Sequence, residues 1–142
     1  MEFKSTKDLE KYINRIVVEA MSKGNAVKNT VIEEGKKQVQ ETVYNVYPEP
    51  KVYIRTGKLK ESWNWQDAPD GIEIINTRTD EESGKYIPSV VESGKGYDYT
   101  GYGYDYEKPR PFIDNTIKNL EGSAKLTEAL KQDLRKQGIS VE

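Results

Sequence analysis

The first 44 residues constrain the fold most, because they carry an apolar stripe longer than a chain of 142 residues can easily bury. Apolar side chains recur there at steps of three and four residues, which places them on one helix face. They are Leu9, Ile13, Ile16, Val17, Ala20, Met21, Val27 and Val31. A helix of about 40 residues would be about 60 Å long. We therefore expect the helix either to divide, with Gly24 and Gly35 as its weak points, or to lie against another chain.

The periodicity changes after Pro48 and Pro50, which end the helix because each lacks an amide hydrogen and restricts the residue before it. Tryptophans then alternate with polar residues, a turn follows at residues 68–71, and isoleucines come next. This pattern predicts a β-hairpin over residues 62–77. Residues 86–91 are apolar but contain Pro88, so they form either an edge strand or a short helical turn.

A second helical stripe, from Ile113 to Leu134, predicts a C-terminal helix over about 111–137. Pro111 is well suited to its first position, Gly122 and Ser123 interrupt it, and Gly138 ends it. The order of elements predicts an α+β fold in a single domain, residues 1–142. A long N-terminal helix, about 5–45, packs on a small antiparallel β-sheet within about 52–106, followed by the C-terminal helix.

Composition narrows the possible functions. The chain has no histidine and no cysteine, which removes the commonest general base, the commonest metal ligands and thiolate nucleophiles. We expect no catalytic residue, no cofactor and no metal site. The net charge of -2 gives no general attraction to nucleic acid, and no stretch approaches the roughly 20 apolar residues that span a membrane. The mean hydropathy of -0.87 indicates a lean core, so we expect neighbouring subunits to bury part of the apolar surface.

Residues 94–112, GKGYDYTGYGYDYEKPRPF, hold five of the ten tyrosines. With Thr100 and Gly101 as a two-residue hairpin loop, all five would share one face, although an irregular glycine-rich loop is the alternative. Tyrosine is enriched at protein interfaces, which favours a contact surface over burial in the chain's own core. The predicted interface residues are Tyr97, Tyr99, Tyr102, Tyr104 and Tyr106. A binding module for carbohydrate or single-stranded nucleic acid is the alternative function, although the nearby charges balance and form no basic groove.

Three further segments follow one another along the chain, and both their order and their spacing are informative: RTGKLKES at 55–62, YIPSVVESG at 86–94 and PRPFI at 109–113. Together they resemble the head–tail joining, or tail-completion, proteins of the neck of long-tailed bacteriophages, over residues 5–120. Ser93 stands where that family usually has an aromatic residue, and Pro88 interrupts the second segment. The residues that carry the resemblance are Thr56, Gly57, Leu59, Ser62, Tyr86, Val91, Glu92, Gly94, Pro109, Arg110, Pro111 and Phe112.

The resemblance implies a structural virion protein without enzymatic activity. Such proteins form a ring, typically sixfold, between the portal or head-completion protein and the tail-tube protein, and DNA passes through it only as cargo. The chain would be made in the cytoplasm of the bacterial host and would end in the neck of the virion. Arg110, held between two prolines, would pair with Glu92 or with a neighbour's carboxylate, and a solvent-facing Arg110 is the alternative.

Overall fold

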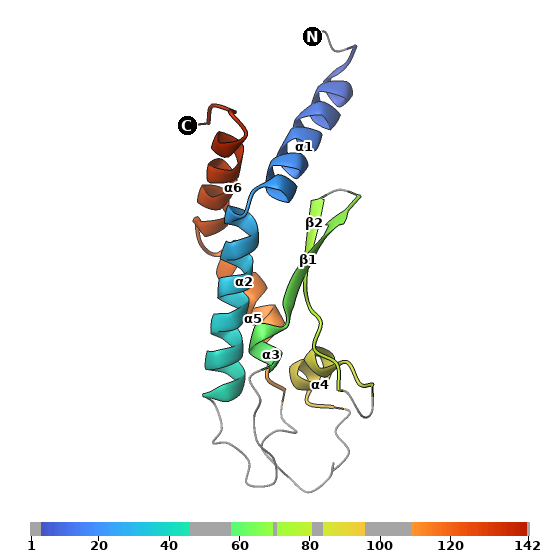
Figure 1. Ribbon diagram of the computed structural model, residues 1–142, viewed down its shortest axis with the longest axis vertical. Helices are drawn as coiled ribbons and strands as arrows, with labels where there is room; N and C mark the ends of the chain where they lie inside the picture. The colour runs from blue at the N-terminus through green and yellow to red at the C-terminus, as the bar shows by residue number, and fades with distance from the viewer. Residues whose placement is uncertain (1–3, 46–57, 70, 81–83, 96–108, 142) are drawn as a thin grey trace, which may run out of the picture.

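The computed structural model describes residues 4–45, 58–69, 71–80, 84–95 and 109–141 (Figure 1). Within these residues it contains α-helices, a π-helix and a two-stranded antiparallel sheet, which confirms the predicted α+β class. The elements are α1 (Thr6–Lys23), α2 (Ala26–Gln38), η1 (Val39–Tyr44), α3 (Lys58–Glu61), β1 (Trp63–Ala68), β2 (Gly71–Asn76), α4 (Ile87–Ser93), α5 (Phe112–Glu121) and α6 (Lys125–Lys136).

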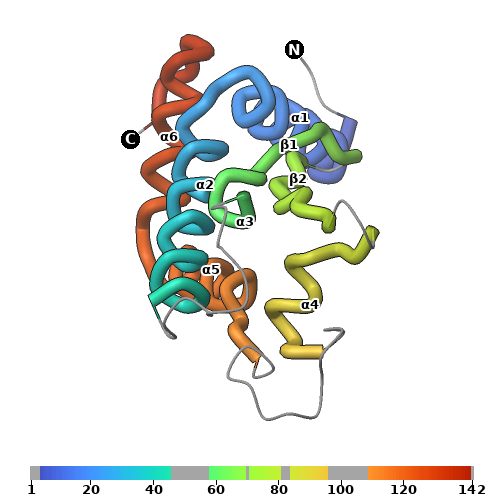
Figure 2. Tube along the Cα trace, turned by 60° about the horizontal axis from the view of Figure 1, so that its bottom comes forward, coloured from blue at the N-terminus to red at the C-terminus, as the bar shows by residue number. Residues whose placement is uncertain are grey.

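The helix α2 is the spine of the molecule, and η1 continues it without a break. It packs against α5 and α6 along one side and against β1 and β2 along the other. Figures 1 and 2 show α2 between α6 and the hairpin, with α5 beneath α6 and α4 set apart from α6 across the molecule. The N-terminal helices therefore contact the sheet as expected, since α1 contacts β2 and α2 contacts β1.

The expected helix over 5–45 divides at Gly24, one of its two predicted weak points. The side chain of Asp133, from α6, accepts hydrogen bonds from the backbone amides of Ala26 at 2.9 Å and Val27 at 3.0 Å. A Cβ atom on Gly24 would collide with this carboxylate. A residue without a side chain is therefore needed at the break, because α6 approaches the backbone closely there.

Gly35 does not break the helix, because it lies inside α2. Its missing side chain makes room for Trp63 of β1, whose Cζ2 atom would lie 2.6 Å from an added Cβ. The second predicted weak point is thus a site of close packing between helix and hairpin.

A small polar network joins the end of α1 to the hairpin and to α2. The Ser22 hydroxyl donates to Asp67 Oδ1 at 2.6 Å, and Lys28 Nζ donates to the carbonyl oxygen of Ser22 at 2.5 Å. Lys28 Nζ also lies 3.1 Å from the ring centroid of Trp65, a cation–π contact. Burial lowers the pKa of Lys28, and the carboxylates of Asp67 and Asp133 partly oppose that shift.

The predicted hairpin over 62–77 is confirmed. Trp63 pairs with Asn76 and Ala68 with Gly71, and the Thr77 amide donates to the Ser62 carbonyl at 2.8 Å. Within the described part of the expected sheet region of 52–106, residues 87–93 form α4 instead of a strand, and an isolated bridge joins Thr79 to Tyr86.

Of the two alternatives for residues 86–91, the helical one is therefore correct and the edge strand is wrong. Pro88 lies in the first turn of α4, where its missing amide hydrogen has no helical partner to lose. Gly94 ends the helix at φ 72°, a left-handed conformation that favours glycine.

The expected C-terminal helix over 111–137 divides into α5 and α6, and the interruption lies at Gly122 and Ser123 as predicted. Pro111 is the N-cap of α5, one position earlier than expected, and Gly138 follows α6 at φ 81°. Across the part of the chain that the structure describes, no helix combines the length and apolarity that a bilayer crossing needs.

The buried ammonium of Lys28 predicts a specific dependence of stability on pH. Its pKa is lowered in the folded chain, so between that pKa and the ordinary value near 10.5 the unfolded chain binds more protons. The contribution of Lys28 to stability should therefore increase as the pH rises through this window. Urea unfolding of the native chain and of Lys28→Met, at about pH 7 and about pH 10, measures it.

Between these two pH values, the free energy of unfolding of the native chain should rise relative to that of Lys28→Met. The rise should be about 1 kcal/mol for each unit by which the fold lowers the pKa of Lys28. The comparison cancels the titration of the other lysines, which both chains share. A difference that stays constant across this range would contradict the prediction.

Candidate functional site

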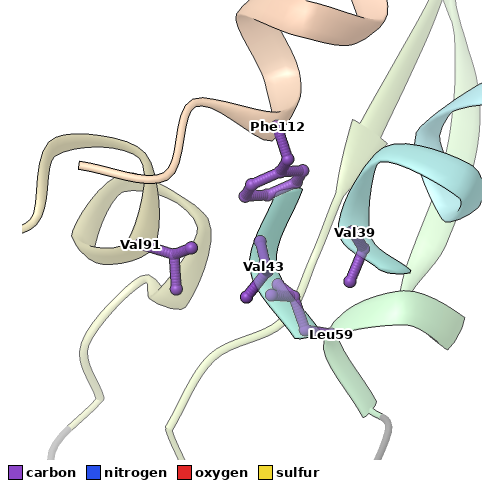
Figure 3. Close-up of a cluster of buried hydrophobic side chains, with 5 residues drawn as sticks. All are labelled: Val39, Val43, Leu59, Val91 and Phe112. Carbon is purple, nitrogen blue, oxygen red and sulfur yellow. The ribbon is translucent and has the colours of Figure 1, made fainter. Parts of the chain in front are cut away.

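The three segments that carry the family resemblance meet in one hydrophobic core. Leu59 of α3, Val91 of α4 and Phe112 of α5 pack with Val39 and Val43 of η1, and all five are buried (Figure 3). Phe112 and Val39 are fully buried, at 0% exposure. We call these five residues the motif core. Segments that lie far apart in the chain thus form a single packed unit, since Leu59 and Phe112 both belong to it.

The motif core is continuous with the hairpin through Trp63. The Trp63 and Phe112 rings pack edge to face, with centroids 6.1 Å apart and planes at 83°. This geometry sets the positive edge of one ring against the face of the other, a favourable arrangement for aromatic pairs. Gly35 lets the other side of the indole lie against α2. The tryptophan therefore locks hairpin, α2 and α5 together.

Glu92 positions the start of α5. Its Oε2 accepts a hydrogen bond from the Ile113 amide at 2.9 Å, and its Oε1 accepts one from the Asp114 amide at 3.1 Å. The residue at the N-cap position, Pro111, has no side-chain acceptor of its own. A carboxylate from α4 thus satisfies amides that the helix itself leaves without partners, and its charge complements the helix dipole.

Arg110 joins the second and third segments through its backbone. Its amide donates to the Val91 carbonyl at 3.0 Å, and the residue is only 6% exposed. The solvent-facing alternative for Arg110 is therefore wrong. Glu92 uses both carboxylate oxygens on the α5 amides, and pairing of the guanidinium with a carboxylate stays a prediction.

Asn76 joins the first and second segments. Its side-chain amide donates to the Leu59 carbonyl at 2.6 Å, its Oδ1 accepts from the Arg78 amide at 3.0 Å, and its carbonyl accepts from the Tyr86 hydroxyl at 2.6 Å. Asn76 is 1% exposed, so these bonds are needed to satisfy its polar atoms. Burial raises the pKa of the Tyr86 phenol.

The sequence interpretation missed Asn76, although a signal was present. Period-two alternation places it on the same strand face as Ile72 and Ile74, which is the face toward the helices. A polar residue at the end of an inward-facing apolar series indicates a buried hydrogen-bonding role.

The other described motif residues shape the backbone. Ser62 donates its hydroxyl to the Lys58 carbonyl and thereby closes α3 before β1 begins. Gly94 ends α4, Pro111 occupies the N-cap position of α5, and Pro109 is exposed.

Seven predicted site residues lie outside the described residues: Thr56, Gly57, Tyr97, Tyr99, Tyr102, Tyr104 and Tyr106. Their roles stay predictions. What the structure does describe is the two flanks of the tyrosine segment, which the bond from the Arg110 amide to the Val91 carbonyl holds side by side. The motif core is therefore a fixed base from which the chain departs after α4 and to which it returns before α5.

Outside the motif core, the described residues offer a groove but no cluster of metal ligands. An open groove of about 750 Å³ lies between α2 and α6, lined by both Glu33 and Lys37 and by Lys125 and Glu128. Its lining holds three glutamates, with Glu34 as the third, against two lysines, and includes no residue of the motif core. The described residues contain no cluster of three or more carboxylates able to hold a metal ion.

Comparison with known proteins places the chain in a family. The YomN family model matches residues 5–136. The chain belongs to the YomN family. It is 36% identical over 141 residues to the SPbeta prophage-derived uncharacterized protein YomN of Bacillus subtilis strain 168, across 98% of this chain and 99% of that protein. No solved structure matches. These two matches support the phage origin that the motif segments predict. The role in head–tail joining stays a prediction.

The capping role of Glu92 predicts a local loss of protection at the start of α5. We expect Glu92→Ala to lower the free energy of unfolding by about 1 kcal/mol. Hydrogen exchange should quicken at the Ile113 and Asp114 amides before it changes elsewhere. Glu121→Ala, at the opposite end of α5, is the matched control, because an acidic side chain there does not complement the helix dipole. Equal losses in both variants, or unchanged exchange at the two amides, would contradict the role.

The motif core predicts a large difference between two apolar positions of the same helix. Phe112→Ala should destabilise the chain by about 3–5 kcal/mol, because it removes a fully buried ring and leaves a cavity. Ile117 is 49% exposed, so Ile117→Ala should cost about 1 kcal/mol or less. Chemical denaturation of both variants measures the contrast. Losses of similar size would show that Phe112 does not anchor the core.

Proposed function

We propose that this YomN-family protein is a structural virion protein that joins the phage head to the tail. The observation that carries the proposal is the convergence of the three motif segments: Leu59, Val91 and Phe112, each from a different segment, lie in one buried core. Segments that resemble the same family and also pack together are more informative than three short matches along a chain. The prophage origin of the relative agrees with this role.

In this proposal the chain assembles as a homo-oligomeric ring, hexameric in the virion. One face of the ring contacts the portal or head-completion protein and the other contacts the tail-tube protein. DNA crosses the central channel only as cargo, and the ring seals the joint. The protein uses neither cofactor nor metal and catalyses no reaction. It is made in the cytoplasm of the host bacterium and resides in the neck of the virion.

The geometry of the flanks explains why a tyrosine segment would serve this role. Glu92 and the backbone bond between Arg110 and Val91 fix both ends of the segment on the motif core. Anchored ends reduce the chain entropy that contact formation must overcome. Repetition around a ring offsets the remaining entropy, because each contact raises the effective concentration of the next. Tyrosine adds large contact area with few rotatable bonds.

Exposed apolar side chains agree with an assembling subunit. Leu9 and Ile13 of α1 are 39% and 49% exposed, and Ile117 of α5 is 49% exposed. They lie on different helices rather than in a single patch. Such a distribution suits a ring subunit, which contacts neighbours on two sides through different surfaces.

The proposal predicts the particles that a phage makes without this gene. Deleting it from the phage or prophage that carries it should yield DNA-filled heads and separate, complete tails, because only their joining is lost. Electron microscopy of induced lysates and a count of infectious particles measure this. A complementing copy with all five segment tyrosines changed to serine should fail to restore infectivity, while a copy with Tyr12→Ser, a tyrosine outside the segment, should restore it.

Normal infectious particles from the deletion would overturn the proposal. So would tails that stop at an early stage or heads that never fill, since these place the protein elsewhere in assembly. A saturable quench of tryptophan fluorescence by an oligosaccharide or by single-stranded DNA, together with normal particles, would favour the binding-module alternative.

A further inference from the structure

The break between α1 and α2 uses side chains where a continuous helix would use its own backbone. In a continuous α-helix the amides of Ala26 and Val27 would donate to the carbonyl oxygens four residues earlier, those of Ser22 and Lys23. In the structure both amides donate instead to the carboxylate of Asp133. The Ser22 carbonyl accepts from Lys28 Nζ. Asp133 and Lys28 therefore bind backbone groups that would form hydrogen bonds within the helix if α1 and α2 were continuous.

The sequence on either side of the break keeps the phase of one helix. At 100° per residue, Val17 and Met21 lie at the edge of the apolar stripe, and its six other positions fall within about 60° of one another on a single helix face. They are Leu9, Ile13, Ile16 and Ala20 before it, and Val27 and Val31 after it. A stripe that continues in register suits a straight helix as well as a bent one.

Local sequence does not enforce the bend. Neither Gly24 nor Asn25 is a proline, and the structure assigns Asn25 no side-chain capping bond. Gly24 has φ -85° and ψ -179°, an extended conformation open to any residue. The cause of the bend is thus the tertiary contact with α6, above all the buried carboxylate of Asp133, which is 1% exposed.

The arm that would move, α1, contacts α6 and β2, but little of it is fully buried. Ala20 is the one buried residue of α1, and the first turns of the helix carry exposed Leu9 and Ile13. Figure 1 shows α1 reaching away from the rest of the molecule, with its N-terminal end farthest from α2. At its C-terminal end the Ser22 hydroxyl donates to Asp67 of the hairpin.

We infer that the junction of α1 and α2 is a two-state elbow. In the bent state, seen here, Asp133 and Lys28 latch it. In the straight state, the Ala26 and Val27 amides return to the Ser22 and Lys23 carbonyls, and α1 and α2 form one continuous helix. Straightening exchanges one set of backbone hydrogen bonds for another of nearly equal number, and it moves the apolar stripe of α1 away from α6 and the hairpin. This inference stands apart from head–tail joining and does not depend on it.

Distance measurement between two spin labels tests the elbow directly. The chain has no cysteine, so Lys7→Cys and Lys37→Cys, both at exposed positions, introduce the label sites without competing thiols. In a continuous helix these positions, 30 residues apart, are separated by about 45 Å. The bent chain gives a shorter distance.

Two variants should shift the balance toward the straight state for different reasons. Gly24→Ala adds a Cβ atom that collides with Asp133 in the bent state, and alanine favours a continuous helix. Asp133→Asn removes the charge and one of the two acceptors that hold the α2 amides, with no added bulk. For Asp133→Asn we expect the population near about 45 Å to rise at least about tenfold, the effect of losing one charge-assisted hydrogen bond, and for Gly24→Ala a rise at least as large, because the collision disfavours the bent state. Gly71→Ala, whose added Cβ meets nothing within 4 Å, is the matched control and should keep the native distance.

Circular dichroism and cooperative thermal unfolding report whether each variant is folded. The inference is overturned if folded Gly24→Ala and Asp133→Asn keep the native distance, or if their distances only broaden without a population near about 45 Å. If Gly24→Ala does not fold, Asp133→Asn decides. Unfolding of both variants also overturns it, because the bent elbow would then be the sole folded arrangement.

Discussion

The structure depends on carboxylates that cap helices from a distance. Asp133 of α6 gives its two oxygens to the first amides of α2, and Glu92 of α4 gives its two to the first amides of α5. Neither capped helix has a side-chain capping hydrogen bond from its own N-cap residue, whereas α1 uses its own Ser5. An unsatisfied amide costs about 1–3 kcal/mol when buried. The positions of α2 and α5 are therefore set by residues 107 and 21 positions away.

This dependence explains what the sequence could and could not predict. The hairpin follows from alternation around Trp63, and the helix breaks fall at Gly24 and Gly122, because these signals are local. The reason for each glycine is not local. Gly35 looks like a weak point, yet it accommodates the ring of Trp63, and the division at Gly24 follows the approach of Asp133. Contacts between distant residues leave no periodic trace, so a single sequence did not reveal them.

The candidate site also depends on contacts between residues that are distant in the sequence. Glu92 and Arg110 both belong to the motif segments, and both position other elements. Glu92 fixes the start of α5, and the Arg110 backbone holds the chain before α5 against α4. Asn76 performs a comparable role between the hairpin and α4 and belongs to none of the motif segments. The described residues that carry the resemblance thus form a structural scaffold. In the proposed role, specificity lies in the tyrosine segment that this scaffold holds at both ends.

The elbow and the motif core lie at opposite ends of one spine. Lys28 belongs to the first turn of α2 and Val43 to η1, so a helical rise of about 1.5 Å per residue separates the two regions by about 20 Å. They share α2 but no hydrogen bond among those described here. Rearrangement at the elbow would change the direction of α1 while leaving Leu59, Val91 and Phe112 packed. In the proposed role, one rigid helix would therefore allow the two ends of the subunit to contact different neighbours independently, as a joint between head and tail would require.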